Sequence, residues 1–396
     1  MKLEQEIQVT FRYTICFTRD VFAPGNDVLL SQIQGSRPKV VFLLDSGLEE
    51  AQPKLRLQIE QWLHNHQDRI RACPPVTVQG GEACKNDPEY FLQIARILRD
   101  HHLDRHSYVV IVGGGSVLDA VGFAASITHR GIRHIRLPST VLAQCDSGIG
   151  VKNGINFLGA KNFLGTFTPP WAVINDLGFL QTLSLRDWIA GISEAFKVAI
   201  IKDRRFLSFL VEHCRALKAR DEQDMEETIT RCARLHADHI ATGGDPFEAG
   251  SARPLDFGHW SAHCLETRSG YELRHGEAVA IGIALDLGIA RNRGLISPQD
   301  YTAVVNALRA IGLPVWHPVL GHREKDGRMS VYRGLEEFRE HLGGELTLVM
   351  PRELGHSCEI HDLSYGEIER AMQETEETFG QGNHEARKWQ SSHVLS

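Results

Sequence analysis

The stretch SYVVIVGGGSVLDAVGFAAS, residues 107–126, gives the clearest indication of the fold class. It begins with a run of β-branched residues, passes through Gly113, Gly114 and Gly115, and continues with apolar residues at helical spacing. A strand that turns directly into a helix is the repeating unit of open parallel sheets. Glycines at such a turn let a phosphate approach the backbone at the N-terminus of the helix. A tight turn without a ligand is the alternative, because the G-x-G-x-x-G fingerprint is absent.

Short apolar segments lie on both sides of this unit, with helical patterns between them. Such alternation predicts a parallel sheet with helices on both faces. Apolar and polar residues alternate over residues 7–17, which predicts a half-buried strand near the start of the chain. The buried strands are expected at Val40–Leu44, Val76–Val78, Val109–Val112 and Ile135–Leu137.

The pattern changes after about residue 178, where the periodicity becomes helical. We therefore predict an α/β domain over residues 1–177 and a mostly α-helical domain over residues 178–380. One segment of the second domain, Glu345–Val349, has the composition of a strand. Residues 381–396 are polar and without periodicity, and we expect them to form a flexible tail.

The bulk composition excludes several classes of protein. A net charge of −7 and a pI near 6.3 argue against a nucleic-acid-binding face, although a local pocket for a small phosphorylated ligand is compatible with them. The eight cysteines are scattered, with no C-x-x-C pair, as expected for cytosolic thiols. The chain has no signal-peptide pattern and no run of about 18 apolar residues, so we expect a cytoplasmic protein without a membrane partner.

Polar residues gather where the strands of the α/β domain end. Asp45 closes a strand, as does the acid that holds an adenosine ribose in many such sheets, although a turn or cap explains it equally well. Glu82 and Lys85 follow Gly81, and a surface ion pair would explain them too. The loops 138–156 and 159–167 are dense in small and polar residues and predict a shaped pocket, with a solvated loop as the alternative. Its expected lining is Arg130, Asp146, Lys152, Lys161 and Asn162.

Histidine and glutamate residues in the helical domain have the spacing of a metal site. Glu194 and Lys197 lie three apart in a helical stretch, where a structural ion pair is also a simple explanation. His259 and His263 share a helical face, and His275 begins the next helix. Imidazole and carboxylate ligands suit zinc, and three protein ligands leave one position for a substrate oxygen. Spacing alone favours His259 with His263 as ligands, and capping or core histidines are the alternative.

These segments together resemble the dehydroquinate synthase-like sugar phosphate cyclases. The matching stretches occur in that family's order across about residues 40–290, with a weaker match to residue 370. They read GGGSVLDAVGFAA, RGIRHIRLPSTVLAQCDSGIGVKNGIN, GAKNFLGTF, ISEAFK, DFGHWSAHCLE and RHGEAVAIG. The resemblance implies a Rossmann-like NAD-binding α/β domain followed by a mostly α-helical metal- and substrate-binding domain, in a homodimer.

The resemblance also assigns roles to residues. It makes Glu194, His259 and His275 the ligands of Zn²⁺ or Co²⁺, and it moves His263 to the substrate pocket. Arg130, Lys152 and Asn162 would bind the substrate phosphate, with Arg130 reaching the neighbouring subunit. Asp146, Lys197 and Asp256 would complete the substrate site. NAD would be held by Asp45, Glu82, Lys85, Gly114, Gly115, Ser116, Asp119, Ser139, Thr140, Lys161, Phe179 and Thr182.

The implied reaction has no net redox change. NAD⁺ transiently oxidises a hydroxyl held on the metal, phosphate leaves by elimination, the hydride returns, and an intramolecular aldol step closes a carbocycle. The resemblance therefore implies a lyase.

The chain departs from true 3-dehydroquinate synthases just before His259. The arginine expected to bind a substrate carboxylate is Ala252, with Arg253 displaced by one position, and an expected asparagine is Asp256. A carboxylate facing Asp256 would be repelled, whereas a hydroxymethyl group can donate a hydrogen bond to it. We therefore predict a seven-carbon ketose phosphate, sedoheptulose 7-phosphate, as substrate and a valiolone-type cyclitol as product.

Three alternatives stay open at this point. A 3-dehydroquinate synthase would use the carboxylated substrate, with Arg253 swinging in. An iron-type alcohol dehydrogenase would be a net oxidoreductase with a similar domain plan, but with an aspartate and several histidines on the metal. A non-catalytic scaffold would be expected to have lost ligands that this chain retains.

Overall fold

The computed structural model describes residues 2–158, 160–248, 254–325, 327–341 and 343–380. The chain divides into two compact units, Met1–Leu183 and Ser184–Ser396, with the division six residues after the predicted position 177. The predicted tail, residues 381–396, lies outside the described residues. In the described part of the chain, no helix has the length and apolar character needed to cross a membrane.

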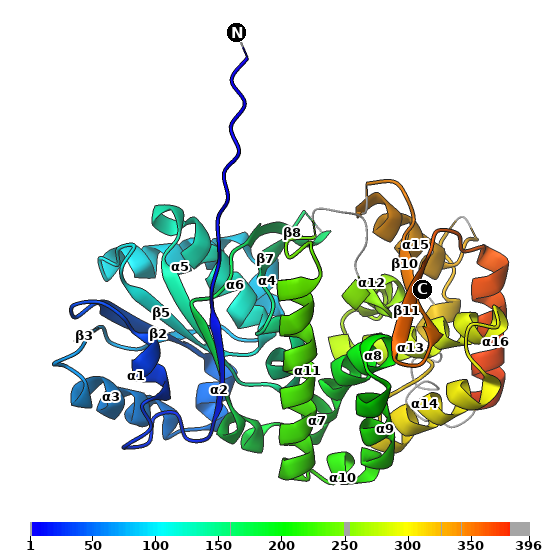
Figure 1. Cartoon of the computed structure of the whole chain (residues 1–396), viewed down its shortest axis with the longest axis horizontal. Helices are drawn as coiled ribbons and strands as arrows, with labels where there is room; N and C mark the ends of the chain where they lie inside the picture. Colours follow the sequence, from blue (N-terminus) through cyan, green and yellow to red (C-terminus); the bar gives the residue numbers. More distant parts are fainter. Residues whose placement is uncertain (1, 159, 249–253, 326, 342, 381–396) are drawn as a thin grey trace. The chain divides into compact units, whose positions relative to one another are not determined.

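The first unit is built around a parallel sheet (Figure 1). The strand order is β1-β9-β6-β5-β2-β3, and β4 also pairs with β2. The sheet strands are β1 (Thr14–Thr18), β2 (Lys39–Asp45), β3 (Arg71–Ala72), β4 (Val76–Val78), β5 (Tyr108–Gly113), β6 (Arg133–Pro138) and β9 (Ala172–Asp176). Every pairing in this sheet is parallel, so the carboxyl ends of the strands share one edge.

Helices cover both faces of this sheet, as the alternation of strands and helices predicts (Figure 1). Strand residues point alternately to the two faces, so Val41 and Leu43 pack on the side of α5 and α6, whereas Phe42 and Leu44 pack on the side of α3. The helices and short helical turns are α1 (Val28–Gln32), α2 (Ser46–Ala51), α3 (Leu55–Asn65), α4 (Ala83–Asn86), α5 (Pro88–Asp100), α6 (Gly115–Ile127), η1 (Thr128–Arg130), η2 (Ala143–Ser147) and η3 (Leu177–Thr182). A separate antiparallel hairpin joins β7 (Lys152–Phe157) to β8 (Ala160–Phe167).

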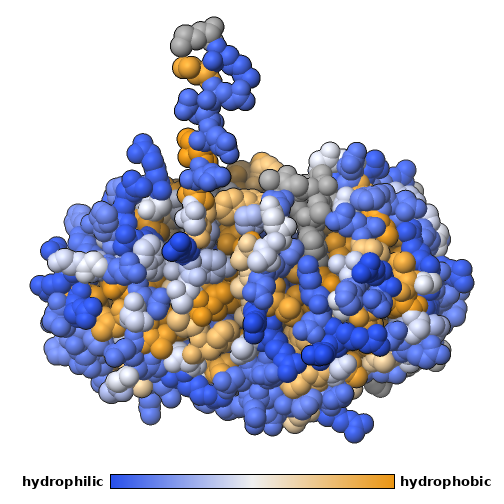
Figure 2. Space-filling view, viewed as in Figure 1, coloured by the Kyte–Doolittle hydropathy of each residue, from blue (hydrophilic) through white to orange (hydrophobic). Residues whose placement is uncertain are grey.

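The strand predicted over residues 7–17 is wrong for most of its length. Only β1 is a strand, and residues 2–13 are extended without strand pairing. Leu3, Ile7 and Val9 are 75, 84 and 67% exposed, and Figure 2 shows apolar side chains along this segment. The alternation in sequence is therefore real, but the face that it would bury has no cover within the first unit.

The second unit is mostly helical, as predicted. Its helices are α7 (Leu185–Ala190), α8 (Ile192–Lys202), α9 (Arg204–Glu212), α10 (Cys214–Lys218), α11 (Glu222–Thr242), η4 (Pro254–Asp256), α12 (His259–Arg268), α13 (His275–Asn292), α14 (Pro298–Ile311), η5 (Pro318–Gly321), α15 (Ser330–His341) and α16 (Tyr365–Phe379). The strand predicted at Glu345–Val349 overlaps β10 (Leu348–Glu353) only at Leu348 and Val349, so β10 begins three residues later than predicted. It pairs antiparallel with β11 (His356–Ile360), which the periodicity did not predict.

A glycine brings two of these helices into close contact. A Cβ added to Gly276, in the first turn of α13, would lie 1.9 Å from the carbonyl oxygen of Ala190 and 2.9 Å from the Oγ of Ser193. Any larger residue would push α13 away from the end of α7 and the start of α8. Because His275 and Glu194 are the neighbours of Gly276 and Ser193, this contact sets the two side chains beside each other.

Candidate metal centre and cofactor loops

Three side chains of the second unit could hold a metal ion. Ligand atoms of Glu194 on α8, His259 on α12 and His275 on α13 all lie within 4.8 Å of one another. The Nε2 atoms of His259 and His275 lie 3.8 and 3.6 Å from the same carboxylate oxygen, Oε1 of Glu194. Tetrahedral zinc bonds of about 2.0–2.2 Å place neighbouring ligand atoms about 3.4 Å apart. The donor set therefore has the chemistry and nearly the spacing that zinc requires.

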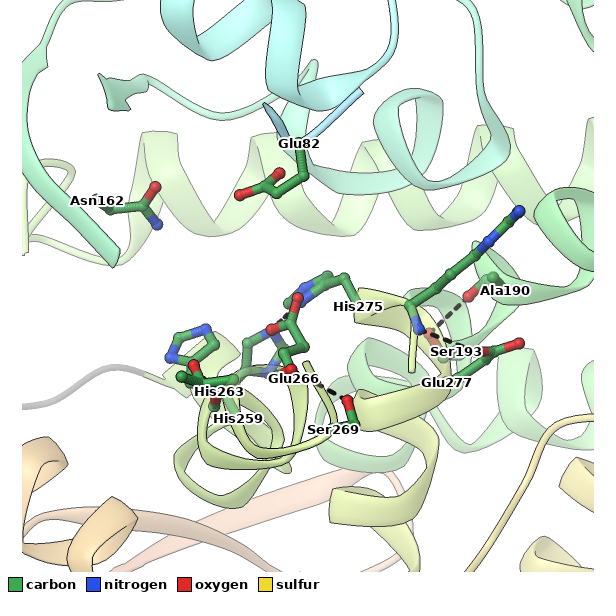
Figure 3. A network of polar contacts seen from close by, with 12 residues as sticks. Glu82, Asn162, Ala190, Ser193, His259, His263, Glu266, Ser269, His275 and Glu277 are labelled. Atoms are coloured by element: carbon green, nitrogen blue, oxygen red, sulfur yellow. Dashed lines mark hydrogen bonds and ion pairs between the residues drawn. The ribbon is translucent and has the colours of Figure 1, made fainter. Parts of the chain in front are cut away.

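Hydrogen bonds orient both imidazoles for this role. The Nδ1 of His259 lies 3.2 Å from the carbonyl oxygen of Phe257, which can only accept, so the proton is on Nδ1 and Nε2 keeps its lone pair. The Nδ1 of His275 lies 3.1 Å from Oε2 of the buried Glu266 (Figure 3). A carboxylate partner on the far nitrogen of a histidine is a common feature of metal sites. Both Nε2 atoms are thus directed toward Glu194.

Burial also favours the metal-binding form of His259. The loss of solvent lowers the pKa of His259 well below its usual value, and the nearby positive charge of Lys197 lowers it further. The ring is therefore neutral near pH 7, which is the form that donates a lone pair to a metal. Lys197 itself is buried and places Nζ 2.5 Å from Oε2 of Glu194, the oxygen that does not face the histidines.

The structure does not support the pairing of ligands that spacing alone favours. His259 and His263 have ring centroids 5.7 Å apart in an edge-on arrangement, and no candidate metal group in the described residues contains both. His263 instead groups with Glu266 and His275 (Figure 3). We favour the group with Glu194, because the Nδ1 of His275 is already engaged with Glu266 while its Nε2 faces Glu194.

The start of α12 is fixed by a buried carboxylate that the sequence did not single out. Asp286 accepts from the backbone N–H of Gly258 and from Nε1 of Trp260, both at 2.8 Å, and so ties down the residues on either side of His259. Gly258 has a left-handed φ of 77°, and a Cβ there would lie 3.0 Å from the backbone nitrogen of Ile283. Burial raises the pKa of Asp286 to about 7, against the opposite effect of its two hydrogen bonds.

The predicted cofactor residues of the first unit gather at the carboxyl edge of the sheet. Asp45 at the end of β2 accepts from Gly47 N at 2.9 Å, and Gly114 N lies 3.3 Å from its other oxygen. A Cβ on Gly113 or Gly80 would lie 2.9 or 2.0 Å from atoms of Asp45, so both glycines make room for this side chain. Asp45 therefore caps α2, and a cap residue was the alternative to a ribose contact in the sequence analysis. Its contact with a ribose remains a prediction.

Two polar networks link other predicted residues of this unit. The buried Lys85 donates to Oδ2 of Asp119 at 2.8 Å and to Oδ1 of Asn162 at 2.6 Å. The pKa of Lys85 is raised despite the opposing effect of burial, because the charges of Asp119 and Glu82 favour its ionised form. Glu82 accepts from the Oγ of Ser116 at 2.5 Å. Lys85 is thus no surface ion pair, since its side chain is 4% exposed.

Asn156, which was not predicted as a site residue, extends the network of Glu82 and Ser116. Its Nδ2 lies 3.3 Å from Glu82 and 2.7 Å from Asn86, and its Oδ1 accepts from the backbone of Asn162 at 2.8 Å. The remaining predicted residues of this unit lie after the carboxyl ends of β5, β6 and β9: Gly115 at the start of α6, Ser139 and Thr140 directly after β6, Asp146 in η2, Lys152 and Lys161 in the hairpin strands β7 and β8, and Phe179 and Thr182 in η3.

Two predicted residues differ from this group in their position. Arg130 lies before β6, at the amino edge of the sheet, so the structure does not bring it to the other predicted residues of its own first unit. It is exposed and has a left-handed φ of 62°, next to His129 with 51° and Gly131 with 117°. Asp256 ends the turn η4, whereas Ala252 and Arg253 lie outside the described residues.

Comparison with known proteins identifies two matching family models. The model for the N-terminal region of 3-dehydroquinate synthase matches residues 75–190, and that for the C-terminal region matches residues 191–331. A 2-epi-5-epi-valiolone synthase from Streptomyces glaucescens is 33% identical over 354 residues, covering 89% of this chain and 87% of its own. A 3-dehydroquinate synthase from Nitratiruptor sp. is 35% identical over 288 residues, covering 71% of this chain and 77% of its own.

A solved structure agrees over most of the chain. The 2-epi-5-epi-valiolone synthase from Streptomyces hygroscopicus subsp. jinggangensis, determined with NAD⁺ and Zn²⁺ bound, superposes with a TM-score of 0.84. It is 27% identical, and the match covers 96% of this chain and 100% of that one.

Proposed function

Because the chain belongs to the dehydroquinate synthase-like sugar phosphate cyclases, we propose that it converts sedoheptulose 7-phosphate to a valiolone-type cyclitol with loss of phosphate. It is an NAD- and metal-dependent lyase, with Zn²⁺ or Co²⁺ as the ion. The observation that carries the proposal is the match of nearly the whole chain to a 2-epi-5-epi-valiolone synthase. The cluster of Glu194, His259 and His275 agrees with it, because such an enzyme needs a metal site with an open position.

When bound, NAD⁺ would supply a reversible hydride acceptor, and a metal ion held by the three side chains named above would supply a Lewis acid for the substrate oxygens. Glu194, His259 and His275 hold the ion. Lys197 places its buried ammonium group against the outer oxygen of Glu194, and this contact fixes the orientation of the carboxylate. We assign Lys197 and His263 to the substrate side of the metal.

We propose that NAD lies along the carboxyl edge of the parallel sheet. The N-terminus of α6 directly after β5 offers free backbone N–H groups to its pyrophosphate. Asp45, Glu82 and Lys85 bind it from the neighbouring loops. The other proposed contacts are Gly114, Gly115, Ser116, Asp119, Ser139, Thr140, Lys161, Phe179 and Thr182.

The substrate phosphate needs cations and hydrogen-bond donors, and we assign them from the resemblance to the family. Lys152 at the start of β7 and Asn162 in β8 bind it together with Arg130 of a second subunit. Asp146 binds substrate hydroxyl groups. This arrangement explains why Arg130 is exposed and at the opposite edge of the sheet in its own subunit.

The choice of substrate rests on Asp256. We propose that this carboxylate accepts a hydrogen bond from the hydroxymethyl group of the ketose phosphate. A substrate carboxylate at the same place would bring two negative charges together at a cost in binding free energy. The runner-up function, 3-dehydroquinate synthase, would require Arg253 to neutralise that carboxylate.

A two-substrate phosphate-release assay tests the function. We expect release from sedoheptulose 7-phosphate and none from the carboxylated seven-carbon phosphate of the shikimate route. The reverse preference would establish the 3-dehydroquinate synthase function instead. Steady accumulation of NADH without phosphate release would indicate a dehydrogenase of the iron-type alcohol dehydrogenase class. Glu194→Ala and His275→Ala are expected to lose both bound metal and turnover, and full metal content in both variants would refute the assigned ligands.

We also propose that the enzyme works as a homodimer in the cytoplasm. The exposed apolar residues Leu3, Ile7 and Val9 lead into β1, an edge strand, and a second subunit is a natural partner for such a segment. All eight cysteines are free thiols, as is usual in a reducing compartment. Light scattering should give a mass of about twice 44.3 kDa, and a monomer at assay concentrations would contradict the dimer.

A further inference from the structure

One arginine of the first unit is buried against a loop rather than against a carboxylate. Arg136 on β6 is 0% exposed. Its Nη1 donates to the carbonyl oxygens of Ser147, Gly148 and Gly150 at 3.2, 3.1 and 2.7 Å. Its Nη2 donates to the carbonyl oxygen of Lys152 at 3.1 Å and to Oδ1 of Asn153 at 2.7 Å. Five acceptors within seven consecutive residues therefore converge on one side chain.

This arrangement keeps a positive charge inside the protein. Burial lowers the pKa of Arg136 to about 10, against the opposing effect of Asp119, so the guanidinium remains ionised at neutral pH. Among the described residues, no ion pair joins Arg136 to a carboxylate, and the carbonyl dipoles of the loop solvate the charge instead. Hydrogen bonds to a charged group are stronger than those between neutral groups. The backbone path of the loop is thus tied to a single rigid strand.

A second set of contacts fixes the far end of the same loop. Asn153 is buried, and its Nδ2 donates to the carbonyl oxygen of Thr168 at 3.0 Å. A Cβ on Gly122, within α6, would lie only 2.1 Å from Oδ1 of Asn153, so the helix leaves room for this side chain. Near the start of the loop, a Cβ on Gly148 would lie 2.5 Å from the carbonyl oxygen of Ala143. Residues 147–153 therefore have little freedom while Arg136 is in place.

We propose that Arg136 is a positioning residue, which orders residues 147–153 and so sets the places of Lys152 within this segment and of Asp146 directly before it. The inference rests on the proposed function, in which Asp146 and Lys152 contact the substrate. Arg136 does not contact the substrate itself, because its guanidinium is enclosed by the loop. A displacement of reacting groups by about 1 Å can cost about a hundredfold in rate, so an ordered loop has a direct effect on turnover.

The test compares Arg136→Lys with Arg133→Lys. Lysine keeps the charge but offers one nitrogen where Arg136 uses two, so it cannot reach all five acceptors. Arg133 lies on the same strand but contacts Tyr108 and Trp171 rather than the loop, which makes it a matched control. For Arg136→Lys we expect faster hydrogen exchange of the amides of residues 147–153 and a ten- to hundredfold lower kcat. Metal content should be unchanged, and Arg133→Lys should resemble the wild type in both measurements.

Asn153→Ala is a milder second variant, in case Arg136→Lys does not fold. It removes one of the five acceptors and should give a smaller increase in exchange confined to the same residues. The proposal would be overturned if a folded Arg136→Lys showed the same hydrogen-exchange rates as the wild type at residues 147–153. If Arg136→Lys is unfolded, wild-type exchange rates in Asn153→Ala would overturn it. Faster loop exchange with wild-type kcat would overturn it too. If the wild type released no phosphate from either substrate, the proposed function would fail, while the exchange pattern would still decide whether Arg136 orders the loop.

Discussion

Replacing Glu266 should weaken zinc binding without changing any of the three assigned ligands. Its carboxylate is 4% exposed and accepts from Nδ1 of His275, which leaves Nε2 of that ring directed at Glu194. The two histidine Nε2 atoms already lie 3.6 and 3.8 Å from Oε1 of Glu194, close to the separation of about 3.4 Å expected around tetrahedral zinc. The protein therefore holds the ligands almost in place, and Glu266 is one reason that it does.

The size of the effect depends on what replaces the carboxylate. Glutamine keeps an oxygen that can accept from Nδ1 but removes the negative charge that makes the imidazole a stronger donor. Alanine removes the acceptor and lets the ring of His275 rotate. Loss of such a partner costs about 10- to 100-fold in metal affinity. We expect Glu266→Gln near the lower value and Glu266→Ala near the upper, or about 1.4 and 2.8 kcal/mol.

Competition with a chromophoric zinc chelator measures these affinities in the absence of substrate. Glu272→Gln is the control, because Glu272 is an exposed carboxylate in the segment between α12 and α13. The control should bind zinc as the wild type does. Equal affinity for zinc in Glu266→Ala and the wild type would show that His275 needs no support from Glu266. A loss in Glu272→Gln as large as that in Glu266→Gln would mean that overall charge, not the hydrogen bond, is responsible.

Two further variants test the packing around this site. Gly276→Ala should lower zinc affinity at least tenfold and destabilise the fold by about 1–3 kcal/mol, because its Cβ would overlap the carbonyl oxygen of Ala190. Gly366→Ala is the control, because a Cβ at Gly366 would have no atom within 4 Å. Unchanged zinc binding in Gly276→Ala would contradict the assigned role of this contact. Asp286 has a raised pKa of about 7, so the folded state holds its proton while the unfolded state loses it between about pH 4 and 7. The stability of the wild type relative to Asp286→Asn should therefore fall as pH rises through this range and level off above it, by about 1.4 kcal/mol per unit of pKa difference. Urea unfolding of metal-free protein at several pH values measures this difference, and a constant difference would show that folding does not raise the pKa of Asp286.

The sequence predicted the parts of the fold that depend on local pattern. The buried strands and the turn at Gly113–Gly115 were correct because a parallel strand covered on both faces is apolar along its whole length. Residues 7–17 show the limit of this reasoning. Their alternation predicts a strand, but a strand also needs a neighbour with which to pair, and the first unit provides one only for β1. The partner of a segment cannot be read from its own periodicity.

The metal cluster shows the same limit at the level of a site. His259 and His263 lie four apart on one helix, so spacing favoured them, yet a metal needs ligand atoms that converge rather than residues that share a face. The convergence here comes from three helices and from the contact of Gly276 with Ala190, which no local pattern reveals. The resemblance to a family carried that information. Glu266 could have been suspected from the sequence, because it lies three residues after His263 and seven after His259 on the same helical face.

Arg136 and Asp286 were missed for a different reason, and it bears on how sites of this kind are built. Neither lies among the predicted ligands or substrate contacts, and neither has a spacing that marks it. Each is a buried ionisable residue that binds backbone groups next to predicted functional residues. Asp286 binds the start of α12 around His259, and Arg136 binds the segment that follows Asp146 and includes Lys152. Burial of an ionisable group costs stability, whether the group stays charged or is neutralised. Such groups are expected next to functional residues in each unit if ordering the backbone there matters more than the stability lost. Hydrogen exchange tests this for Arg136, and urea unfolding at several pH values measures the effect of Asp286 on stability.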